Sequence, residues 1–211
     1  MKNRGNIFVF CLLLASVIIM NSCVKENNGK TIALVGTEYY IDSLLSVIPD
    51  SIQEKFITVF GDIPEGPIPP KIEGSYVVES NMLVSNNQHL PTPSCYPNAY
   101  VRFSEQHNGI AVMDLYDGDE QKTDTVFVMG NETGFTVYCL ENKVVEGMNY
   151  RMERGVMIGG KIRDEGIVDF TMAFIVKKVD GEGQGNAPSR GSYYIYKDND
   201  GLAARCEWPW Q

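Results

Sequence analysis

The chain has few basic residues. Its 211 residues include 18 lysines and arginines against 27 aspartates and glutamates, and the basic residues form no long run. Binding to nucleic acid or to an anionic lipid surface relies on concentrated positive charge. This composition therefore argues against nucleic acid as a partner and against attachment to a membrane by charge alone.

Histidine is scarcer still, since His89 and His107 are the only two. Neither is spaced from a serine or cysteine in the way that a catalytic base accompanies its nucleophile. Two histidines also cannot supply a zinc site without carboxylates from elsewhere. We therefore expect no enzymatic activity, no resident metal and no cofactor.

No hydrophobic run is long enough to cross a membrane. Residues 7–20 are largely apolar and follow Lys2 and Arg4, whereas a spanning helix needs about 20 apolar residues. A short apolar run behind positive charge is typical of a secretion signal.

The apolar run leads to Ser22-Cys23, a small residue followed by a cysteine. This arrangement resembles a bacterial lipoprotein signal peptide, which implies that residues 1–22 are removed and that Cys23 becomes the lipidated first residue. Multiple acyl chains on Cys23 would anchor the protein stably to a membrane. The alternative is an ordinary signal peptide cleaved nearby, with Cys23 unmodified.

Residues 23–36 are expected to form a flexible tether, because the stretch after Cys23 is polar and cannot bury enough apolar surface to order itself. Lys25-Glu26 resembles the charged export signal of surface-exposed lipoproteins of Bacteroidetes-type bacteria. The expected location is therefore the outer membrane, facing either the periplasm or the cell surface.

Cysteines are few and show no C-x-x-C spacing, so neither a redox motif nor a zinc site is supported. Cys11 would leave with the signal peptide and Cys23 would carry lipid, which leaves three. An exported protein can form disulfides. Cys139 lies in an alternating apolar stretch and is expected to be buried, so Cys95 and Cys206, both beside loops, are the expected pair.

Helical periodicity is confined to residues 37–61. Ile41, Leu44, Leu45 and Ile48 form one apolar stripe that ends at Pro49. A second stripe begins after Ser51, which together with Glu54 has the spacing of a capping box, and ends at Gly61. Two short helices are predicted, covering an open end or an edge of a sheet. The proline-rich residues 62–70 then predict a stiff, extended connector.

Residues 71–211 change to a period of two. Alternating apolar runs are separated at fairly regular intervals by turn signals such as Asn108-Gly109 and Asp198-Asn199-Asp200-Gly201. This pattern predicts a mainly β domain of about eight to ten strands, an antiparallel meander that closes or nearly closes. Gly159-Gly160 inside one run predicts a sharp bend. The Asp198–Gly201 stretch lacks the ligand pattern of a calcium loop and is expected to be a hairpin turn.

Gly74-Ser75-Tyr76, at the start of the first predicted strand, resembles the Gly-x-Trp of lipocalins and related calycin-type barrels. In lipocalins an arginine near the last strand packs over that tryptophan, and Arg205 has the matching position relative to Tyr76. The resemblance covers residues 71–207 and implies a lipocalin-like barrel able to hold a small hydrophobic ligand. A barrel of about eight strands can equally be filled by its own side chains.

Two further sets of residues bear on function. Three tripeptides resemble the Asp-Ser/Thr-aliphatic acceptor of Bacteroidetes O-glycosylation, which implies modification at Ser43, Ser51 or Thr125. A group of aromatic residues supports the alternative function, an interaction or structural lipoprotein with a filled core, because exposed aromatic rings often mark contact sites. These residues are Tyr193, Tyr194, Tyr196, Trp208 and Trp210. The sequence identifies no particular protein partner.

Overall fold

The computed structural model describes residues 48–64, 66–116, 121–145, 149–181 and 187–210. The chain divides into two compact units, residues 1–32 and 33–211, and every described residue belongs to the second. The expected signal peptide, the lipidation site Cys23, the tether, the first predicted helix and Ser43 therefore lie outside the described residues. Among the described residues, no helix has the length and apolar character needed to cross a membrane.

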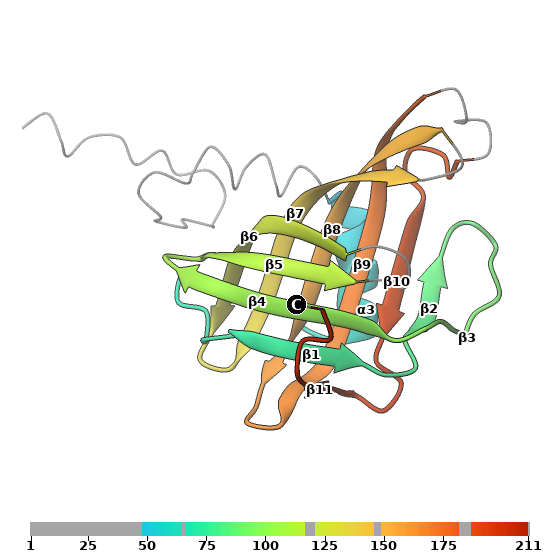
Figure 1. Cartoon of the computed structure of the whole chain (residues 1–211). Coiled ribbons are helices and arrows are strands. Elements are labelled where there is room, and N and C mark those ends of the chain that lie inside the picture. The colour runs from blue at the N-terminus through green and yellow to red at the C-terminus, as the bar shows by residue number, and fades with distance from the viewer. Residues whose placement is uncertain (1–47, 65, 117–120, 146–148, 182–186, 211) are drawn as a thin grey trace, which may run out of the picture. The chain divides into compact units, whose positions relative to one another are not determined.

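The described residues form one helix and eleven strands (Figure 1). All strands belong to one antiparallel sheet in the order β11-β1-β4-β5-β6-β7-β8-β9-β10-β2-β3. The predicted mainly β, antiparallel fold is confirmed. The element bounds are α3 Asp50–Phe60, β1 Gly74–Val78, β2 Met82–Asn86, β3 Ser94–Cys95, β4 Ala99–His107, β5 Ile110–Tyr116, β6 Gln121–Asn131, β7 Gly134–Val145, β8 Tyr150–Ile162, β9 Gly166–Gly181, β10 Tyr193–Lys197 and β11 Leu202–Arg205.

The sheet closes on itself through the long strand β9. The start of β9 pairs with β11, with Ile167 opposite Ala203, and β11 also pairs with β1. Strands β1, β4 to β9 and β11 therefore form a closed, barrel-like ring. The later part of β9 pairs with β10, which carries β2 and β3 as a branch beside the ring.

A register shift in β8 lies between Gly159 and Lys161, where the sequence predicted a bend. A Cβ atom on Gly160 would collide with the side chain of Ile167 on β9. The two strands approach closely here because Gly160 has no side chain, and such irregularities increase the local bend of a sheet.

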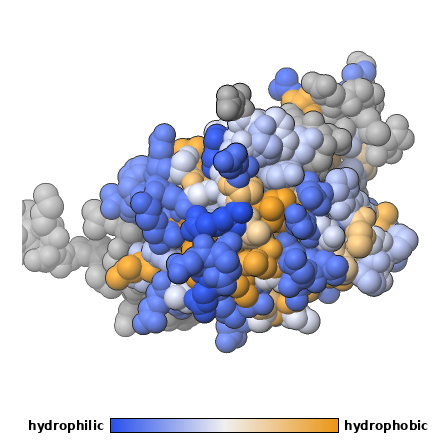
Figure 2. Space-filling model, turned by 60° about the horizontal axis from the view of Figure 1, so that its bottom comes forward, coloured by the Kyte–Doolittle hydropathy of each residue, from blue (hydrophilic) through white to orange (hydrophobic). Residues whose placement is uncertain are grey.

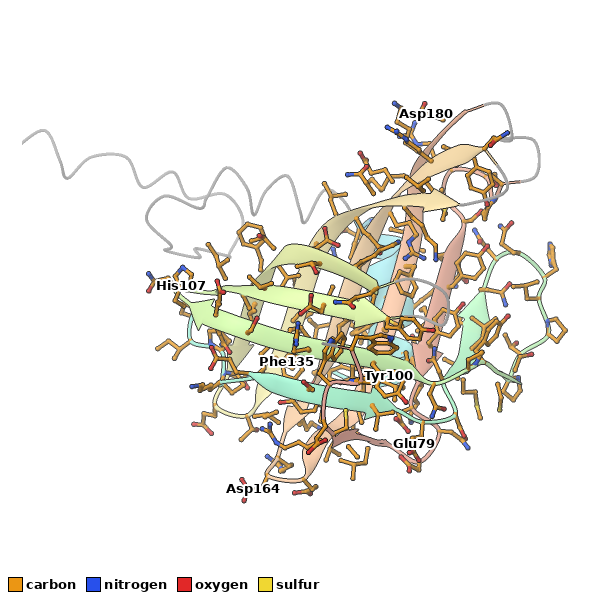
Figure 3. The ribbon with its side chains drawn as sticks, viewed as in Figure 1. Glu79, Tyr100, His107, Phe135, Asp164 and Asp180 are labelled. Carbon is orange, nitrogen blue, oxygen red and sulfur yellow. The ribbon has the colours of Figure 1, made fainter. Side chains whose placement is uncertain are left out.

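Alternate residues of the ring strands point inward and fill the interior. Phe135 lies inside the ring in Figure 3, with its ring centroid 6.2 Å from that of Phe103, which lies 6.4 Å from that of Tyr76. The interior side chains form one cluster in which no residue exceeds 4% exposure. Its members are Ile72, Tyr76, Val78, Ala99, Val101, Phe103, Ala111, Met113, Leu115, Val126, Val128, Phe135, Val137, Cys139, Val156, Ile158, Ile167, Phe170, Met172, Phe174 and Ala203.

Helix α3 lies against the outside of the ring, over β8 and β9, and not over an open end or an edge as predicted (Figure 1). Its Phe56 side chain is fully buried and packs on Gly159 of β8, where an added Cβ would lie only 3.1 Å from the Phe56 ring. Outward-facing Met157 and Ala173 are buried as well. These strands are apolar on both faces because the helix covers the outer one.

The predicted capping box at Ser51 and Glu54 is wrong. Pro49 is the N-cap residue, no side chain caps the helix, and the Pro49 carbonyl accepts bonds from Ile52 and Gln53. Ser51 lies inside the first turn and is exposed. The helix begins at Asp50, two residues earlier than an N-cap at Ser51 would require. The predicted C-terminal end at Gly61 is confirmed: its φ is 92° and its N–H donates to Ile57 O at 2.7 Å.

The proline-rich connector runs beside the β6–β7 hairpin. Gly130 N donates to Gly66 O at 3.0 Å, and Thr136 Oγ1 donates to Pro64 O at 3.2 Å. Pro67 forms an isolated bridge with Gly130. The connector therefore lies against the ring and leads into β1.

Candidate functional site

Tyr76, Arg205 and Gly74 lie in contact at one end of the ring. These are the three residues on which the resemblance to lipocalins was based. Tyr76 and Arg205 are opposite each other in the β1–β11 register, and the Arg205 guanidinium lies 5.1 Å from the centre of the Tyr76 ring. The Tyr76 hydroxyl donates to Ile72 O at 2.9 Å. Burial raises the pKa of this hydroxyl, and the charge of Arg205 opposes that rise. The structure thus brings all three residues together.

Gly74 has a structural reason to be glycine. Its φ is 142°, and a Cβ atom there would collide with Nη1 of Arg205 and lie 3.2 Å from the Tyr76 hydroxyl. Arg205 reaches past it to Glu73 O at 3.4 Å, and its Nε donates to Asp164 O at 3.1 Å. The guanidinium therefore links the first strand, the last strand and the β8–β9 turn.

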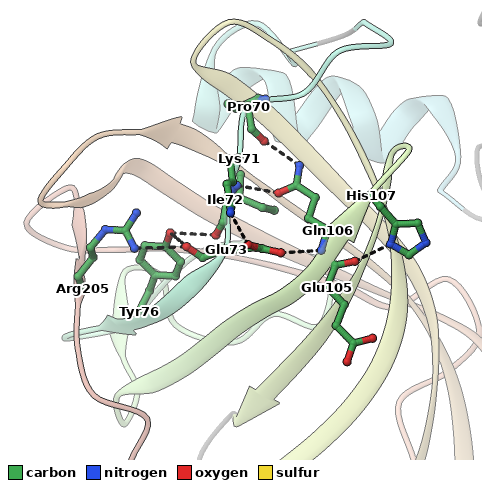
Figure 4. A network of polar contacts seen from close by, with 9 residues as sticks. All are labelled: Pro70, Lys71, Ile72, Glu73, Tyr76, Glu105, Gln106, His107 and Arg205. Carbon is green, nitrogen blue, oxygen red and sulfur yellow. Dashed lines mark hydrogen bonds and ion pairs between the residues drawn. The ribbon is translucent and has the colours of Figure 1, made fainter.

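Gln106 completes this fastening, as Figure 4 shows. Its side chain accepts from Ile72 N and donates to Pro70 O, both at 2.8 Å, while its own N–H donates to Glu73 Oε1 at 2.8 Å. The register of β4 shifts between Ser104 and His107, which turns Gln106 toward the segment before β1. Gln106 was not predicted from the sequence, in which its only signal is its position just before a turn.

At the far end of the interior, charged side chains replace the apolar ones. The inward series Phe135, Val137 and Cys139 on β7 continues with Glu141, which is 2% exposed. Glu141 Oε1 lies 2.7 Å from Lys122 Nζ of β6, and Glu141 Oε2 accepts from Arg154 Nε of β8 at 2.8 Å. A carboxylate that continues an inward apolar series is a sequence signal, and the sequence analysis overlooked it.

The surroundings of this charge cluster are largely dry. Burial lowers the pKa of Lys122 and raises that of Asp124, although the ion pair of Lys122 with Glu141 opposes the first shift. Arg154 lies over the Phe174 ring, with its guanidinium carbon 4.3 Å from the ring centre. Burial raises the pKa of the Cys139 thiol well above its usual value. Each oxygen of Glu141 therefore lies beside a cation, one beside Lys122 and the other beside Arg154.

The aromatic group named in the sequence analysis divides into two. Tyr193 on β10 is buried, whereas Tyr194 and Tyr196 are half-buried. Tyr196 packs edge-on against Tyr96, with ring centroids 5.5 Å apart. The two tryptophans lie elsewhere, after β11.

Trp208 and Trp210 pack on the outer face of the ring with two tyrosines of β4 and β5. The Trp210 ring centroid lies 5.2 Å from that of Tyr100, 4.1 Å from that of Tyr116 and 5.3 Å from that of Trp208. All four rings are half-buried. We call Tyr100, Tyr116, Trp208 and Trp210 the aromatic patch.

A polar group borders the aromatic patch. The Arg102 guanidinium lies 4.7 Å from the Trp208 ring centre, and its Nε donates to Asp114 Oδ2 at 2.8 Å. Thr123 Oγ1 donates to the other oxygen of Asp114 at 2.5 Å. The Trp208 indole N–H is buried and has no hydrogen-bond partner among the described residues. On the face seen in Figure 2, hydrophobic side chains lie between hydrophilic ones and form no continuous band.

The predicted disulfide between Cys95 and Cys206 is not formed, since Cys95, Cys139 and Cys206 are all free. Cys95 lies on β3, whose only partner strand is β2 in the branch beside the ring. Cys206 follows β11, and its N–H donates to Ser75 O of β1. The two cysteines border loops but sit on different parts of the sheet. Cys139 is buried, as expected.

The remaining predicted residues do not converge on a site. Ser51 and Thr125 are exposed, on α3 and β6 respectively. The Asp198–Gly201 stretch is the turn between β10 and β11, in which Asp198 Oδ1 accepts from Asp200 N at 3.1 Å. Burial, and then the hydrogen bond with the Asp200 carboxyl, raises the pKa of Asp198 to about 7.

Within the described part of the chain, no group of three or more histidine, cysteine or acidic side chains is arranged to hold a metal ion. No family model, no curated protein and no solved structure matches this chain.

Proposed function

We propose that this protein is a lipid-anchored component of a bacterial outer membrane, in which a filled barrel serves as scaffold and the outer surface contacts a partner. The observation that carries this proposal is the packing of the interior: the rings of Tyr76, Phe103 and Phe135 follow one another at centroid distances of 6.4 and 6.2 Å, and none is more than 1% exposed. A ligand of any size would have to displace several of these side chains, at the cost of cavities or strain elsewhere. Of the two functions considered from sequence, the filled interior favours the interaction protein.

Both ends of the interior support this interpretation. The Tyr76, Arg205 and Gln106 contacts fasten one end, and the Lys122, Glu141 and Arg154 cluster occupies the other. A barrel that admits an apolar ligand needs an open, apolar mouth. Two cations paired with one carboxylate at the end of the interior do not provide such a mouth.

We also propose that the barrel is of the lipocalin or calycin type. The support is the arginine of the last strand stacked on the aromatic residue that follows Gly74 in the first strand. This proposal concerns the type of fold alone, and it does not require that the barrel bind a ligand as lipocalins do.

The aromatic patch is the surface we propose for the partner. It combines half-buried aromatic rings with the ion pair of Arg102 and Asp114, the composition that is enriched at protein interfaces. The glycosylation proposal for the exposed Ser51 and Thr125 is compatible with it, because neither residue belongs to the patch.

Lipid attachment is tested by mass spectrometry of the mature N-terminus, together with the Cys23→Ser variant. The expected result is a lipidated Cys23 in the wild type and release of the variant from the membrane fraction. An unmodified Cys23 in the mature protein would refute the anchor.

The filled interior is tested by native mass spectrometry and by titration with a fluorescent fatty acid. We expect the mass of the protein alone and no saturable binding. Stoichiometric binding whose affinity changes when an interior side chain is shortened, for instance in Phe103→Ala, would instead support the ligand-binding alternative.

A further inference from the structure

The ends of β10 and β2 bring two polar side chains to opposite positions. The last pair of this ladder joins Lys197 to Met82. One step further, the same register sets Asp198, which follows β10, opposite Asn81, which precedes β2 (Figure 1). Opposite residues of an antiparallel pair have their side chains on the same face. Asp198 and Asn81 therefore point to one side of the sheet.

That side is the buried one. Leu83, two residues after Asn81, is fully buried. Tyr196, two residues before Asp198, packs against the interior cluster. Residues two apart in a strand share a face. Asn81 is 6% exposed and Asp198 is 0% exposed, so two polar side chains continue a series that faces inward.

Each of the two side chains carries a buried oxygen without a hydrogen bond. Asn81 Oδ1 and Asp198 Oδ2 have no partner among the described residues, whereas Asp198 Oδ1 accepts from Asp200 N at 3.1 Å. Buried acceptors without a donor are rare in folded proteins, because each gives up its hydration and gains nothing in return. Two such oxygens on one face, at opposite positions, indicate a bound group that contacts both.

Asp200 brings a second carboxylate to the same place. The carboxyl groups of Asp198 and Asp200 are hydrogen-bonded to each other, and Asp200 Oδ1 accepts from Leu202 N at 2.9 Å. Asp200 is exposed, so it connects the buried position to solvent. In the part of the chain that the structure describes, no lysine or arginine pairs with either carboxylate. Two carboxyl groups in contact need a shared proton or a shared cation to offset their repulsion.

Of the groups that could lie between these oxygens, a cation fits best. A proton between the two carboxyl groups leaves Asn81 Oδ1 without a donor, and a water molecule leaves the charges of the carboxylates unbalanced. A cation contacts all three side chains and neutralises their charge. Without it, the two carboxyl groups hold a proton between them.

The ligand atoms also indicate which cation. Carboxylate and amide oxygens are hard ligands, of the kind that Ca²⁺ and Mg²⁺ prefer. Mg²⁺ demands a nearly ideal octahedron, whereas Ca²⁺ accepts irregular sets of about 6–8 oxygens that include waters. Side chains from two separate segments, one buried and one exposed, suit Ca²⁺ better.

We infer that Asn81, Asp198 and Asp200 form a binding site for Ca²⁺ at the ends of β10 and β2. The site departs from the sequence-based expectation of no metal. It is not the contiguous calcium loop that the sequence excludes, because one ligand comes from a different strand. With two acidic side chains and an amide, it is consistent with the lack of any group of three histidine, cysteine or acidic side chains in the described chain. The inference goes beyond the proposed function and depends neither on the lipid anchor nor on the aromatic patch.

Calcium binding is measured by isothermal titration calorimetry on the full-length protein in a neutral detergent, at neutral pH, after a chelating resin has removed metal ions. We expect one saturable site with a dissociation constant on the order of 0.1–1 mM, as in extracellular calcium modules, and weaker binding of Mg²⁺. The melting temperature should rise with Ca²⁺ relative to EDTA, because the ion binds only the folded state.

Asp200→Asn is the main variant, because its side chain is exposed and an asparagine oxygen can still accept the bond from Leu202 N. Loss of a charged ligand should weaken Ca²⁺ binding about tenfold or more. Asp180→Asn is the matched control: it removes the same charge from an exposed carboxylate on β9 that pairs with Lys178 at 2.6 Å. Its affinity should stay within about twofold of the wild type.

Two substitutions of Asn81 test the buried ligand. Asn81→Leu keeps the approximate size but removes the oxygen, and should weaken binding about tenfold. Asn81→Asp keeps the oxygen and adds a charge, so it should bind at least as tightly as the wild type, with a melting temperature that depends more strongly on Ca²⁺. Thermal melts establish which variants are folded, and Asp200→Asn decides the question if Asn81→Leu does not fold.

Three results would overturn the inference. One is the lack of saturable binding at millimolar Ca²⁺, and another is an unchanged affinity in Asp200→Asn. The third is an equal loss in Asp180→Asn, which would mean that Ca²⁺ is attracted diffusely to a chain of net charge −9. None of them would affect the lipid anchor or the filled interior, which are measured separately.

Discussion

Arg205, in the last strand, lies over the ring of Tyr76, in the first, with 5.1 Å between the guanidinium carbon and the ring centre. The same guanidinium donates to backbone carbonyls of Glu73 and Asp164. A single side chain thus joins the two strands whose pairing closes the ring and the turn that precedes β9. This contact lies beside the backbone pairs of β11 with β1 and with β9 that close the ring.

Replacing Arg205 by alanine should therefore lower stability, although the residue is exposed. We expect a loss of about 1 kcal/mol, because a cation–π contact at an exposed site contributes about 0.5–1 kcal/mol. The measurement is the free energy of unfolding in urea. Arg163→Ala, which removes an exposed arginine bonded to its neighbour Ile162 O, is the control. Equal effects of the two substitutions would contradict a closing role for Arg205.

Gly74→Ala tests the close approach of Arg205 from the other side. The new Cβ would collide with the Arg205 guanidinium at a backbone φ of 142°. Gly61→Ala is a matched control, because Gly61 also has positive φ, 92°, but a Cβ added there would meet no atom within 4 Å. Both substitutions carry backbone strain of about 1 kcal/mol. We expect Gly74→Ala to cost at least about 1 kcal/mol more in the free energy of unfolding, and a smaller effect than in Gly61→Ala would refute the clash.

The barrel itself was largely predictable from sequence. Alternation in Phe135-Thr136-Val137-Tyr138-Cys139 fixes which side chains enter the interior, and turn residues such as Asn108-Gly109 fix where the strands reverse. Contacts between distant segments were harder to predict. The Arg205–Tyr76 contact was expected only because a family pattern suggested it.

The failures share a physical cause. The disulfide expectation took sequence position beside loops as a guide to spatial closeness, but β3 and β11 belong to different parts of the sheet. The capping box required Ser51 as the N-cap residue, whereas the helix begins at Asp50 with Pro49 as the N-cap and no side-chain cap. Short sequence patterns do not predict which distant loops come close together in the fold. Nor do they decide which of several possible residues begins a helix.

The charge cluster inside the ring predicts a large effect of Glu141→Gln. This change leaves Lys122 and Arg154 buried without their carboxylate, and unpaired buried charges cost about 3–5 kcal/mol. Asp180→Asn is the control, since Asp180 pairs with Lys178 in solvent at 60% and 64% side-chain exposure, where pairs contribute under about 1 kcal/mol. Urea unfolding of both variants decides the comparison; a Glu141→Gln protein as stable as the control would show that the cluster is solvated.

The free thiols should differ strongly in reactivity. Cys95 is exposed, Cys206 is half-buried with a pKa raised by burial, and Cys139 is buried with a pKa raised further. Because the thiolate is the reactive form, a maleimide should label Cys95 first, Cys206 more slowly and Cys139 only after unfolding. Peptide mapping by mass spectrometry identifies the labelled residue. If neither Cys95 nor Cys206 reacts in the native protein, the result would instead support a disulfide between them.

Asp198 predicts a pH dependence of stability with a defined sign. Its side chain is fully buried, and desolvation together with the Asp200 carboxyl raises its pKa to about 7, against 3.8 in the unfolded chain. The folded state therefore holds a proton between these two values that the unfolded state has lost, and stability falls as pH rises from about 4 to about 7. The lowered pKa of Asp200 acts in a different window, below its unfolded value of 3.8.

The Asp198→Asn variant isolates this group. An asparagine oxygen can still accept the bond from Asp200 N, as Asp198 Oδ1 does at 3.1 Å, but it carries no charge at any pH. At pH 4, close to the unfolded pKa of 3.8, the difference in stability between the variant and the wild type should be smallest. At pH 8 the variant should be the more stable, by on the order of 2 kcal/mol, because the wild type must then bury a carboxylate beside Asp200. Urea unfolding at both pH values measures the difference, with Asp180→Asn as a control that removes a carboxylate from an exposed position. A pH-independent difference between Asp198→Asn and the wild type would mean that Asp198 is ionised throughout and that the turn between β10 and β11 is open to water.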